Sequence, residues 1–250
     1  MDFEFIRNRI LGKKGEFRKL CKANNLTIDF KSNMTEFIVL KSIFEDREYA
    51  DYFPFYKKII VVDIGAHYGY FSLFAHNNSD LESKIYSIEP EKKNYSYLNQ
   101  NILDCHASNI KTYNIGIVDI SGTAKLFKGE NVNHSLIENN ALLCETKEYE
   151  TVDVKSLKDF ISENQINQID FLKMDCEGAE YRILENLPKE IYDKITTISL
   201  EFHDMKDAGI NAEAILHALI RNGFKIVKFT YNTTKRNLNF GKIIGSKTLL

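Results

Sequence analysis

The feature that most constrains the fold is an uninterrupted run of β-branched residues at positions 59–62. These residues read Ile-Ile-Val-Val and lead directly into Asp63-Ile64-Gly65-Ala66. A segment that is apolar at consecutive positions fits a strand buried on both faces, as in a parallel sheet covered by helices. A helical pattern then begins close after the glycine, over about 69–78. The order of strand, glycine turn and helix predicts an α/β protein.

The same alternation continues through the rest of the sequence. Further strands are expected at 84–88, 110–115, 169–174, 197–202, 225–229 and 242–246, and further helices at 91–103, 155–164, 179–187 and 211–222. Residues 124–127 resemble an outer strand, and the polar, Asn-rich segment 128–148 is expected to be a loop. Strands that alternate with helices predict a parallel sheet, here with an antiparallel strand at its edge. No linker interrupts residues 58–250, so they are expected to form one domain.

The first 57 residues have a different pattern, which we interpret as helical. Phe37, Leu40, Ile43 and Phe44 fall on one helix face, and Thr35 is a candidate N-cap. The basic stretch 13–22 is interpreted as a solvated helix face. We therefore expect residues 1–57 to form an N-terminal helical cap on the domain 58–250.

Composition excludes several classes of function. Lys and Arg number 33 against 35 Asp and Glu, a net charge of -2, so binding to nucleic acid through its phosphates is not expected. The four cysteines form no CxxC pair, which favours reduced thiols in a cytoplasmic protein. No apolar run approaches the roughly 18 residues of a membrane span, and the first residues do not read as a signal peptide.

The first candidate site is the glycine turn together with an acid one strand later. Asp63-Ile64-Gly65-Ala66-His67-Tyr68-Gly69 joins a strand to a helix, whose first N–H groups can bind an anionic group. Glu89 ends the next strand, where a carboxylate can accept hydrogen bonds from both hydroxyls of a ribose. The G-x-G-x-x-G of dinucleotide sites is absent. Asp63 suits an ammonium group, so S-adenosylmethionine (SAM) is the ligand favoured over a purely structural turn.

The second candidate site follows two later strands. Lys173, Asp175 and Glu177 stand at alternate positions where an apolar strand ends, and Glu201 and His203 share one face at the end of the next strand. Buried charges are costly unless they are paired or functional. One alternative is an ion pair of Lys173 with Asp175 that closes the sheet. Another is a divalent metal site formed by Asp175, Glu201 and His203.

Four segments together resemble the FkbM-type SAM-dependent methyltransferases in order and spacing. They are Val62–Ser72, Ile88-Glu89-Pro90, Asn114–Ile117 and Lys173–Glu180, the last reading K-x-D-x-E-G-A-E, which is the most specific. The resemblance implies a Rossmann-like class I methyltransferase fold, with a mostly parallel seven-stranded sheet and helices on both faces. It also implies SAM as cofactor and O-methylation of a sugar, glycan or small natural product.

The resemblance also implies roles for individual residues. The cofactor-binding set would be Asp63, Gly65, Ala66, His67, Gly69, Ser72, Glu89, Pro90, Gly116 and Ile117. Its first three members would line the methionine end of SAM, Glu89 would bind the ribose, and the last two would lie near the adenine. Asp175 and Glu177 would lie by the transferred methyl group. His67 replaces the family's usual Asn, and Cys176 its usual Val.

Methyl transfer to an alcohol needs a group that accepts the hydroxyl proton as the new bond forms. Asp175 and His203 are the candidates. If Lys173 pairs with Asp175, the pKa of that carboxyl falls, Asp175 orients the substrate and His203 becomes the better base. Three alternatives to a small-molecule methyltransferase stay open: a methyltransferase of nucleic acid or protein, a SAM-binding module without catalysis, and a nicotinamide-dependent oxidoreductase.

Overall fold

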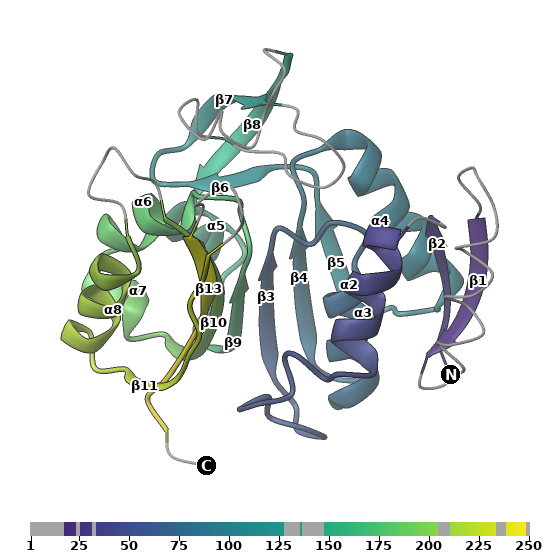
Figure 1. Ribbon diagram of the computed structural model, residues 1–250, viewed down its shortest axis with the longest axis horizontal. Helices are drawn as coiled ribbons and strands as arrows, with labels where there is room; N and C mark the ends of the chain where they lie inside the picture. Colours follow the sequence, from purple (N-terminus) through teal and green to yellow (C-terminus); the bar gives the residue numbers. More distant parts are fainter. Residues whose placement is uncertain are drawn as a thin grey trace.

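The computed structural model describes residues 18–23, 26–31, 34–127, 136, 148–204, 211–233 and 239–248 (Figure 1). Its main sheet has the strand order β11-β13-β10-β9-β3-β4-β5, and β12 pairs with β13 as an eighth strand. These strands are β3 (Ile60–Ile64), β4 (Lys84–Ile88), β5 (Ile110–Tyr113), β9 (Ile169–Met174), β10 (Ile195–His203), β11 (Lys225–Phe229), β12 (Asn232–Thr233) and β13 (Asn239–Ser246). The seven predicted strands are present, and the two-residue β12 is an addition to them.

The pairing directions place a crevice at one end of β3. Strands β3, β4, β5, β9 and β10 are parallel, whereas β13 is antiparallel to both β10 and β11. Chain order reverses at β3, because β4 and β5 lie on one side of it and β9 and β10 on the other. Ligands of open α/β sheets bind beyond the carboxyl ends of the strands at such a switch point.

Helices cover both faces of the sheet (Figure 1). The helices are α2 (Met34–Phe44), α3 (Tyr70–Asn78) and α4 (Lys92–Asp104) on one side, and α5 (Leu157–Glu163), α6 (Glu180–Glu185), α7 (Lys189–Tyr192) and α8 (Ala212–Arg221) on the other. Two hydrophobic cores result. In β3, Val61 belongs to the core under α2 and α3, and Val62 to the core under α5 to α8. A strand buried on both faces, as predicted from its β-branched run, contributes to both cores.

A second, three-stranded sheet lies beyond one end of the main sheet, at the top of Figure 1. Its order is β6-β8-β7, with β6 (Gly116–Val118), β7 (Gly122–Phe127) and β8 (Tyr149–Ser156). The predicted outer strand 124–127 belongs to this sheet, and the helix predicted at 155–164 begins at Leu157 because Ser156 caps it. Most of the predicted loop 128–148 lies outside the described residues.

The prediction of helix throughout residues 1–57 is wrong for residues 18–23 and 26–31. Strands β1 (Arg18–Ala23) and β2 (Leu26–Lys31) form an antiparallel pair there. The reason is visible in the second strand, where Leu, Ile and Phe alternate with polar residues at the period of a strand. Part of the basic stretch 13–22 therefore lies on β1 and not on a helix.

The second part of the N-terminal segment is helical, as expected. In α2, Phe37, Leu40, Ile43 and Phe44 are all buried, which confirms the predicted face. Thr35 lies inside this helix and is not its N-cap. The helix shares a core with α3, and the boundary between a cap at 1–57 and a domain at 58–250 stays a prediction. Within the described residues, no helix is long and apolar enough to cross a membrane.

Candidate active site

The turn after β3 lies very close to the end of β9. Gly65 has a φ of +74°, and a Cβ atom placed on it would lie 1.8 Å from the carbonyl oxygen of Asp175. The N–H groups of Gly65 and Ala66 both donate to the carbonyl of Ile88 at the end of β4. The glycine therefore allows three strand ends to meet, and Gly69 follows as the N-cap of α3.

A buried ion pair lies directly beneath this turn. Lys173 Nζ is 3.1 Å from Asp63 Oδ1 and donates to the carbonyl of Gly65 at 2.6 Å. Ser72 Oγ donates to Asp63 Oδ2, also at 2.6 Å. Burial alone would lower the pKa of Lys173, but the charges of Asp63 and Asp175 outweigh it and raise that pKa. The alternative of a pair between Lys173 and Asp175 is therefore wrong, because the ion pair of Lys173 is with Asp63.

The carboxylate of Glu89 is held by backbone donors. Its oxygens accept the N–H of His67 at 2.8 Å and the N–H of Glu91 at 3.0 Å. Glu89 is 5% exposed, and burial raises its pKa to about 7 against these hydrogen bonds. His67 stacks on Tyr68, and its Nε2 lies 3.8 Å from Glu36 of α2. A carboxylate oriented in this way is pre-formed for polar groups of a ligand.

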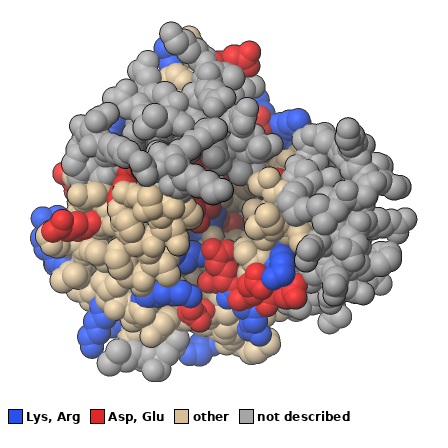
Figure 2. Space-filling view, in the orientation of Figure 1, with Lys and Arg blue, Asp and Glu red and all other residues tan. Residues whose placement is uncertain are grey.

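These strand ends border a pocket. Its space, including the part open to solvent, is about 980 Å³. Predicted residues that line it are Gly65, Ala66, His67, Glu89, Pro90, Gly116, Ile117, Lys173, Asp175 and Glu177. Predicted residues that do not line it are Asp63, Gly69, Ser72, Glu201 and His203. Figure 2 shows a hollow near the middle of this face, with acidic side chains gathered beside it.

Asp63 does not line the pocket, although the resemblance implied that it would line the methionine end of SAM. Its side chain is fully buried, and its carboxylate faces Lys173 and Ser72. Asp63 and Ser72 support the turn from below, whereas Gly65, Ala66 and Lys173 line the pocket. The ammonium contact proposed for Asp63 stays a prediction.

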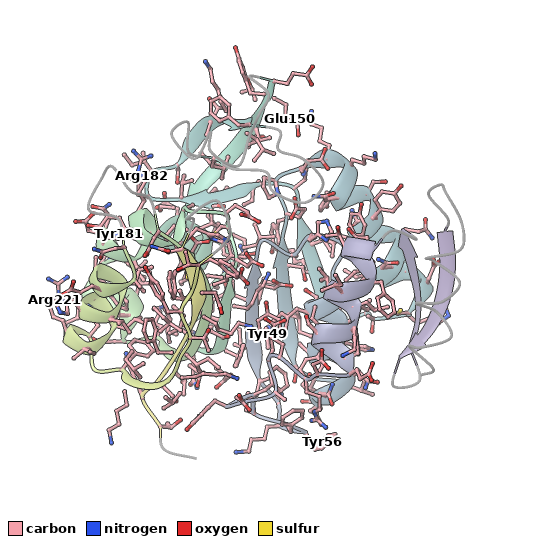
Figure 3. All side chains as sticks on the ribbon, in the orientation of Figure 1. Tyr49, Tyr56, Glu150, Tyr181, Arg182 and Arg221 are labelled. Carbon is pink, nitrogen blue, oxygen red and sulfur yellow. The ribbon has the colours of Figure 1, made fainter. Side chains whose placement is uncertain are left out.

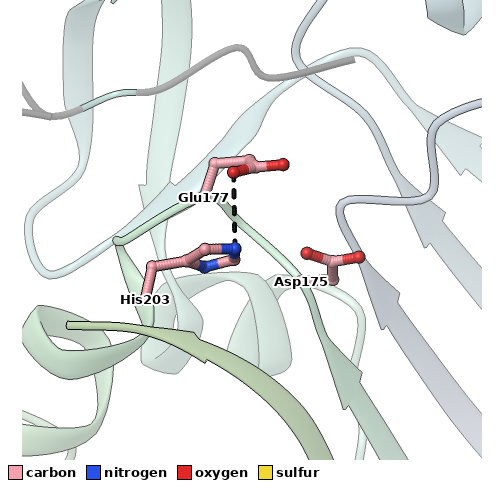
Figure 4. Close-up of side chains that lie close together, drawn as sticks. All are labelled: Asp175, Glu177 and His203. Atoms are coloured by element: carbon pink, nitrogen blue, oxygen red, sulfur yellow. Dashed lines mark ion pairs between the residues drawn. The ribbon is translucent and has the colours of Figure 1, made fainter. Parts of the chain in front are cut away.

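Asp175, Glu177 and His203 gather at one side of the pocket (Figure 4). One possible ligand atom from each of them lies within 4.8 Å of those from the other two, and Glu177 Oε2 is 3.5 Å from His203 Nε2. Glu201 Oε1 is 3.7 Å from the same nitrogen. Behind them, Glu180 accepts the N–H groups of the turn, from Cys176 and Gly178. Carboxylates from two strand ends therefore surround one imidazole.

The protonation of this cluster follows from its burial and its charges. Burial raises the pKa of Glu177, and burial together with the charge of Asp175 raises that of Glu201. Burial alone would lower the pKa of His203, but Glu180 and Glu177 outweigh it and raise that pKa to about 10. At neutral pH the imidazole is therefore a cation.

Several pocket residues have no counterpart in the sequence predictions. Val39 and Ile43 come from α2, and Tyr49 from the segment after it; all three line the pocket. Tyr49 is 5% exposed, and Lys242 Nζ lies 3.8 Å from the centre of its ring. Figure 3 shows Tyr49 near the middle of the molecule. The sequence predicted the apolar face of α2 and a segment 1–57 that covers the site, but not which residues of that segment line the pocket.

A mostly parallel sheet with a pocket at its switch point, a glycine turn and a buried acid after the next strand define a class I SAM-dependent methyltransferase. Comparison with known proteins gives the family. The family model described as "Methyltransferase FkbM domain" matches residues 63–226, so the chain belongs to the FkbM methyltransferases. SAM is therefore its cofactor.

Individual relatives agree with this assignment. "Methyltransferase 1" of Beauveria bassiana is 29% identical over 196 residues, which are 71% of this chain and 78% of the relative. "Methyltransferase sdnD" of Sordaria araneosa is 27% identical over 84% of this chain and 90% of its own. Among solved structures, Trm5b of Pyrococcus abyssi has a TM-score of 0.53 at 10% identity over 93% of this chain and 56% of that chain. This last likeness shows the fold.

Proposed function

We propose that this chain transfers a methyl group from SAM to a hydroxyl oxygen of a sugar, glycan or small natural product. The observation that carries this proposal is the position of Asp175 and Glu177, which line the cofactor pocket and also border His203. Carboxylates beside the methyl donor are suited to orienting an alcohol and accepting its proton.

The residues around the pocket fit the cofactor. A carboxylate has about four acceptor positions, so Glu89 can accept ribose hydroxyls in addition to its backbone donors. The neighbouring part of the pocket has an apolar lining from Ile88, Ile117 and Leu126, which suits the adenine ring of SAM. There, a Cβ atom on Gly116 would lie 2.7 Å from a methyl group of Leu136.

The chain's own residues would position the acceptor and manage its proton. When bound, SAM supplies a methyl group already activated by its sulfonium. Asp175 is the better candidate for the base, because the ion pair of Lys173 is with Asp63 and His203 is held as a cation. His203 and Glu177 would then orient the acceptor, and Lys173 would position the turn through the carbonyl of Gly65.

The experiment is a transfer assay with methyl-labelled SAM against fractionated glycans and small metabolites. The wild-type chain should label a hydroxyl compound. The Asp175→Asn variant should lose about 10²–10⁴-fold in turnover while keeping its affinity for SAM. The matched control is Asp193→Asn, an exposed acid that pairs with Lys189 and Lys247, which should keep both. Label found in RNA or protein, or unchanged turnover of Asp175→Asn, would contradict the proposal.

A cytoplasmic location is also proposed. It is supported by the spacing of the four cysteines, which form no CxxC pair and are too few for a disulfide scaffold, as expected for a reducing compartment. The net charge of -2 agrees with a small acceptor and not with nucleic acid. Cell fractionation with an antibody to the chain would test the location.

A further inference from the structure

Resting on the proposed function, we propose that Asp175, Glu177 and His203 bind a divalent metal ion, with Glu201 at the edge of its coordination sphere. Open positions on this ion would bind oxygen atoms of the methyl acceptor. The site therefore favours acceptors that present two neighbouring oxygens, such as a vicinal diol.

The separations of the side-chain atoms suit a metal ion. With metal–ligand bonds of about 2.1 Å, ligand atoms in an octahedron lie about 3.0 Å apart when adjacent and about 4.2 Å apart when opposite. Glu177 Oε2 and His203 Nε2 are 3.5 Å apart, and the whole set lies within 4.8 Å. Closing around an ion would shorten the widest separation by at most about 0.6 Å if its two atoms became opposite ligands, and by at most about 1.8 Å if they became adjacent ones.

The orientation of the imidazole is a separate observation that points to a metal. His203 directs Nε2 toward Glu177, while its Nδ1 lies 3.8 Å from Glu180 Oε1 (Figure 4). Glu180 is 1% exposed and is fixed by the N–H groups of Cys176 and Gly178. Metal-binding histidines usually donate a hydrogen bond from their second nitrogen to a carboxylate or carbonyl, and Nδ1 of His203 faces such a carboxylate but would have to approach it more closely to make that bond.

The charged side chains around His203 indicate that the bound ion is a cation. Four carboxylates border the single imidazole, those of Asp175, Glu177, Glu180 and Glu201. Among the described residues nearby, Lys173 pairs with Asp63, and Lys242 lies 2.6 Å from Glu48 Oε1. Clustered carboxylates shielded from water are costly without cations to balance them. Binding of a divalent cation would stabilise the ionised carboxylates and would displace the proton that His203 carries in the free protein.

Two carboxylates and one imidazole are a mixed oxygen and nitrogen set, which suits Mn²⁺ and related divalent ions. Three of six positions would stay open for water or for acceptor oxygens. A hydroxyl bound to the ion is a stronger acid, so its proton passes more readily to a carboxylate or to water. The O–CH₃ bond then forms as the S–CH₃ bond of SAM breaks, and S-adenosylhomocysteine leaves. No oxidant or reductant is required.

The test measures binding of Mn²⁺ to the full chain after removal of metals with EDTA. Loss of the electron paramagnetic resonance signal of free Mn²⁺ should show one site per chain. Asp175→Asn and His203→Gln should each weaken that binding more than 10-fold, and Glu180→Gln about 10-fold or more. His217→Gln and Asp193→Asn are matched controls on exposed surfaces and should bind Mn²⁺ as the wild type does.

Folding of each variant is checked by its affinity for S-adenosylhomocysteine, whose pocket the substitutions leave intact around Glu89. The absence of a stoichiometric Mn²⁺ site, or a site unchanged in both Asp175→Asn and His203→Gln, would overturn the inference. Methyl transfer without Mn²⁺ binding would leave the proposed function standing alone. Mn²⁺ binding without transfer to any hydroxyl compound would instead remove the proposed function and keep the metal site.

Discussion

At the scale of single residues, the site depends on a close approach between two strand ends. The backbone of Gly65 contacts the turn after β9, and Lys173 joins the same two strands through Asp63 and the carbonyl of Gly65. Gly65, Lys173 and Asp175 themselves line the pocket, so these contacts determine its shape. Substitution of Gly65 or Lys173 should therefore change the affinity for SAM by displacing the other residues that line the pocket.

Gly65→Ala should therefore be strongly destabilising. The φ of +74° alone would cost a residue with a Cβ atom about 1–2 kcal/mol, and the contact at 1.8 Å with Asp175 adds to it. Gly223→Ala is the matched control, because Gly223 has a φ of +87° with nothing within 4 Å of its Cβ position. Urea unfolding should show a clearly larger loss for Gly65→Ala. Equal losses would mean that the close approach has no energetic consequence.

Glu89 should make the stability of the free protein depend on pH. Its pKa is about 7 in the folded chain, raised by burial from its ordinary value of 4.5. Between these values the native state binds more protons than the unfolded state, so the free energy of unfolding falls as pH rises through this window. Glu89→Gln removes this group and should flatten the slope between pH 4.5 and 7. Urea unfolding at several pH values checks it, and parallel slopes would contradict the assignment.

The partner of Lys173 shows what a sequence leaves open at this scale. The charges at 173, 175 and 177 were recognisable, as were Gly65 and Glu89, because spacing within one segment reveals them. Asp63, however, is 110 positions away from Lys173, and only the register of β3 against β9 places the two opposite each other. Local spacing therefore favoured Asp175 as the partner of Lys173. The pairing of β3 with β9 makes Asp63 the partner instead.

At the scale of elements, buried parallel strands were predictable because their apolar runs are continuous. The β1–β2 pair was not recognised, since its alternation spans only a few residues and lies among charged ones. The small sheet β6-β8-β7 was also missed as a unit. Its strands are separated by more than twenty residues between β7 and β8, and pairing over that distance leaves no local pattern. It contributes Gly116, Ile117 and Leu126 to the pocket.

The face that α2 buries should be essential to stability. Leu40 is fully buried in the core with α3, so Leu40→Ala should cost about 2–5 kcal/mol. Ile38 lies on the opposite side of the same helix and is 56% exposed, so Ile38→Ala should change stability by only about 0.5 kcal/mol. Thermal or urea unfolding would measure both. Similar losses for the two would mean that α2 is held in another way.

At the scale of the whole molecule, the sheet lies between two large hydrophobic cores and contributes residues to both. One core contains α5 to α8, and the other contains α2 and α3. The pocket lies at the carboxyl ends of the strands between these cores, with residues from α2, β3, β4, β6 and β9 around it. The FkbM match begins at residue 63, after α2. Residues that precede the family match, those of α2, therefore contribute both to the core that α2 forms with α3 and to the pocket.

Two truncated chains would show whether the boundary predicted at residue 57 separates an independent domain. A chain of residues 58–250 lacks Phe37, Leu40, Ile43 and Phe44, which would expose Phe71 and other apolar residues of the core under α2. It should lose cooperative unfolding and SAM binding, because the apolar residues that α2 covers would then be exposed to water and the pocket would lack Val39, Ile43 and Tyr49. A chain of residues 34–250 keeps α2 and should retain both properties. Calorimetry with SAM and urea unfolding would measure them. If residues 58–250 unfold cooperatively and bind SAM as the full chain does, then α2 is an appendage and not part of the domain.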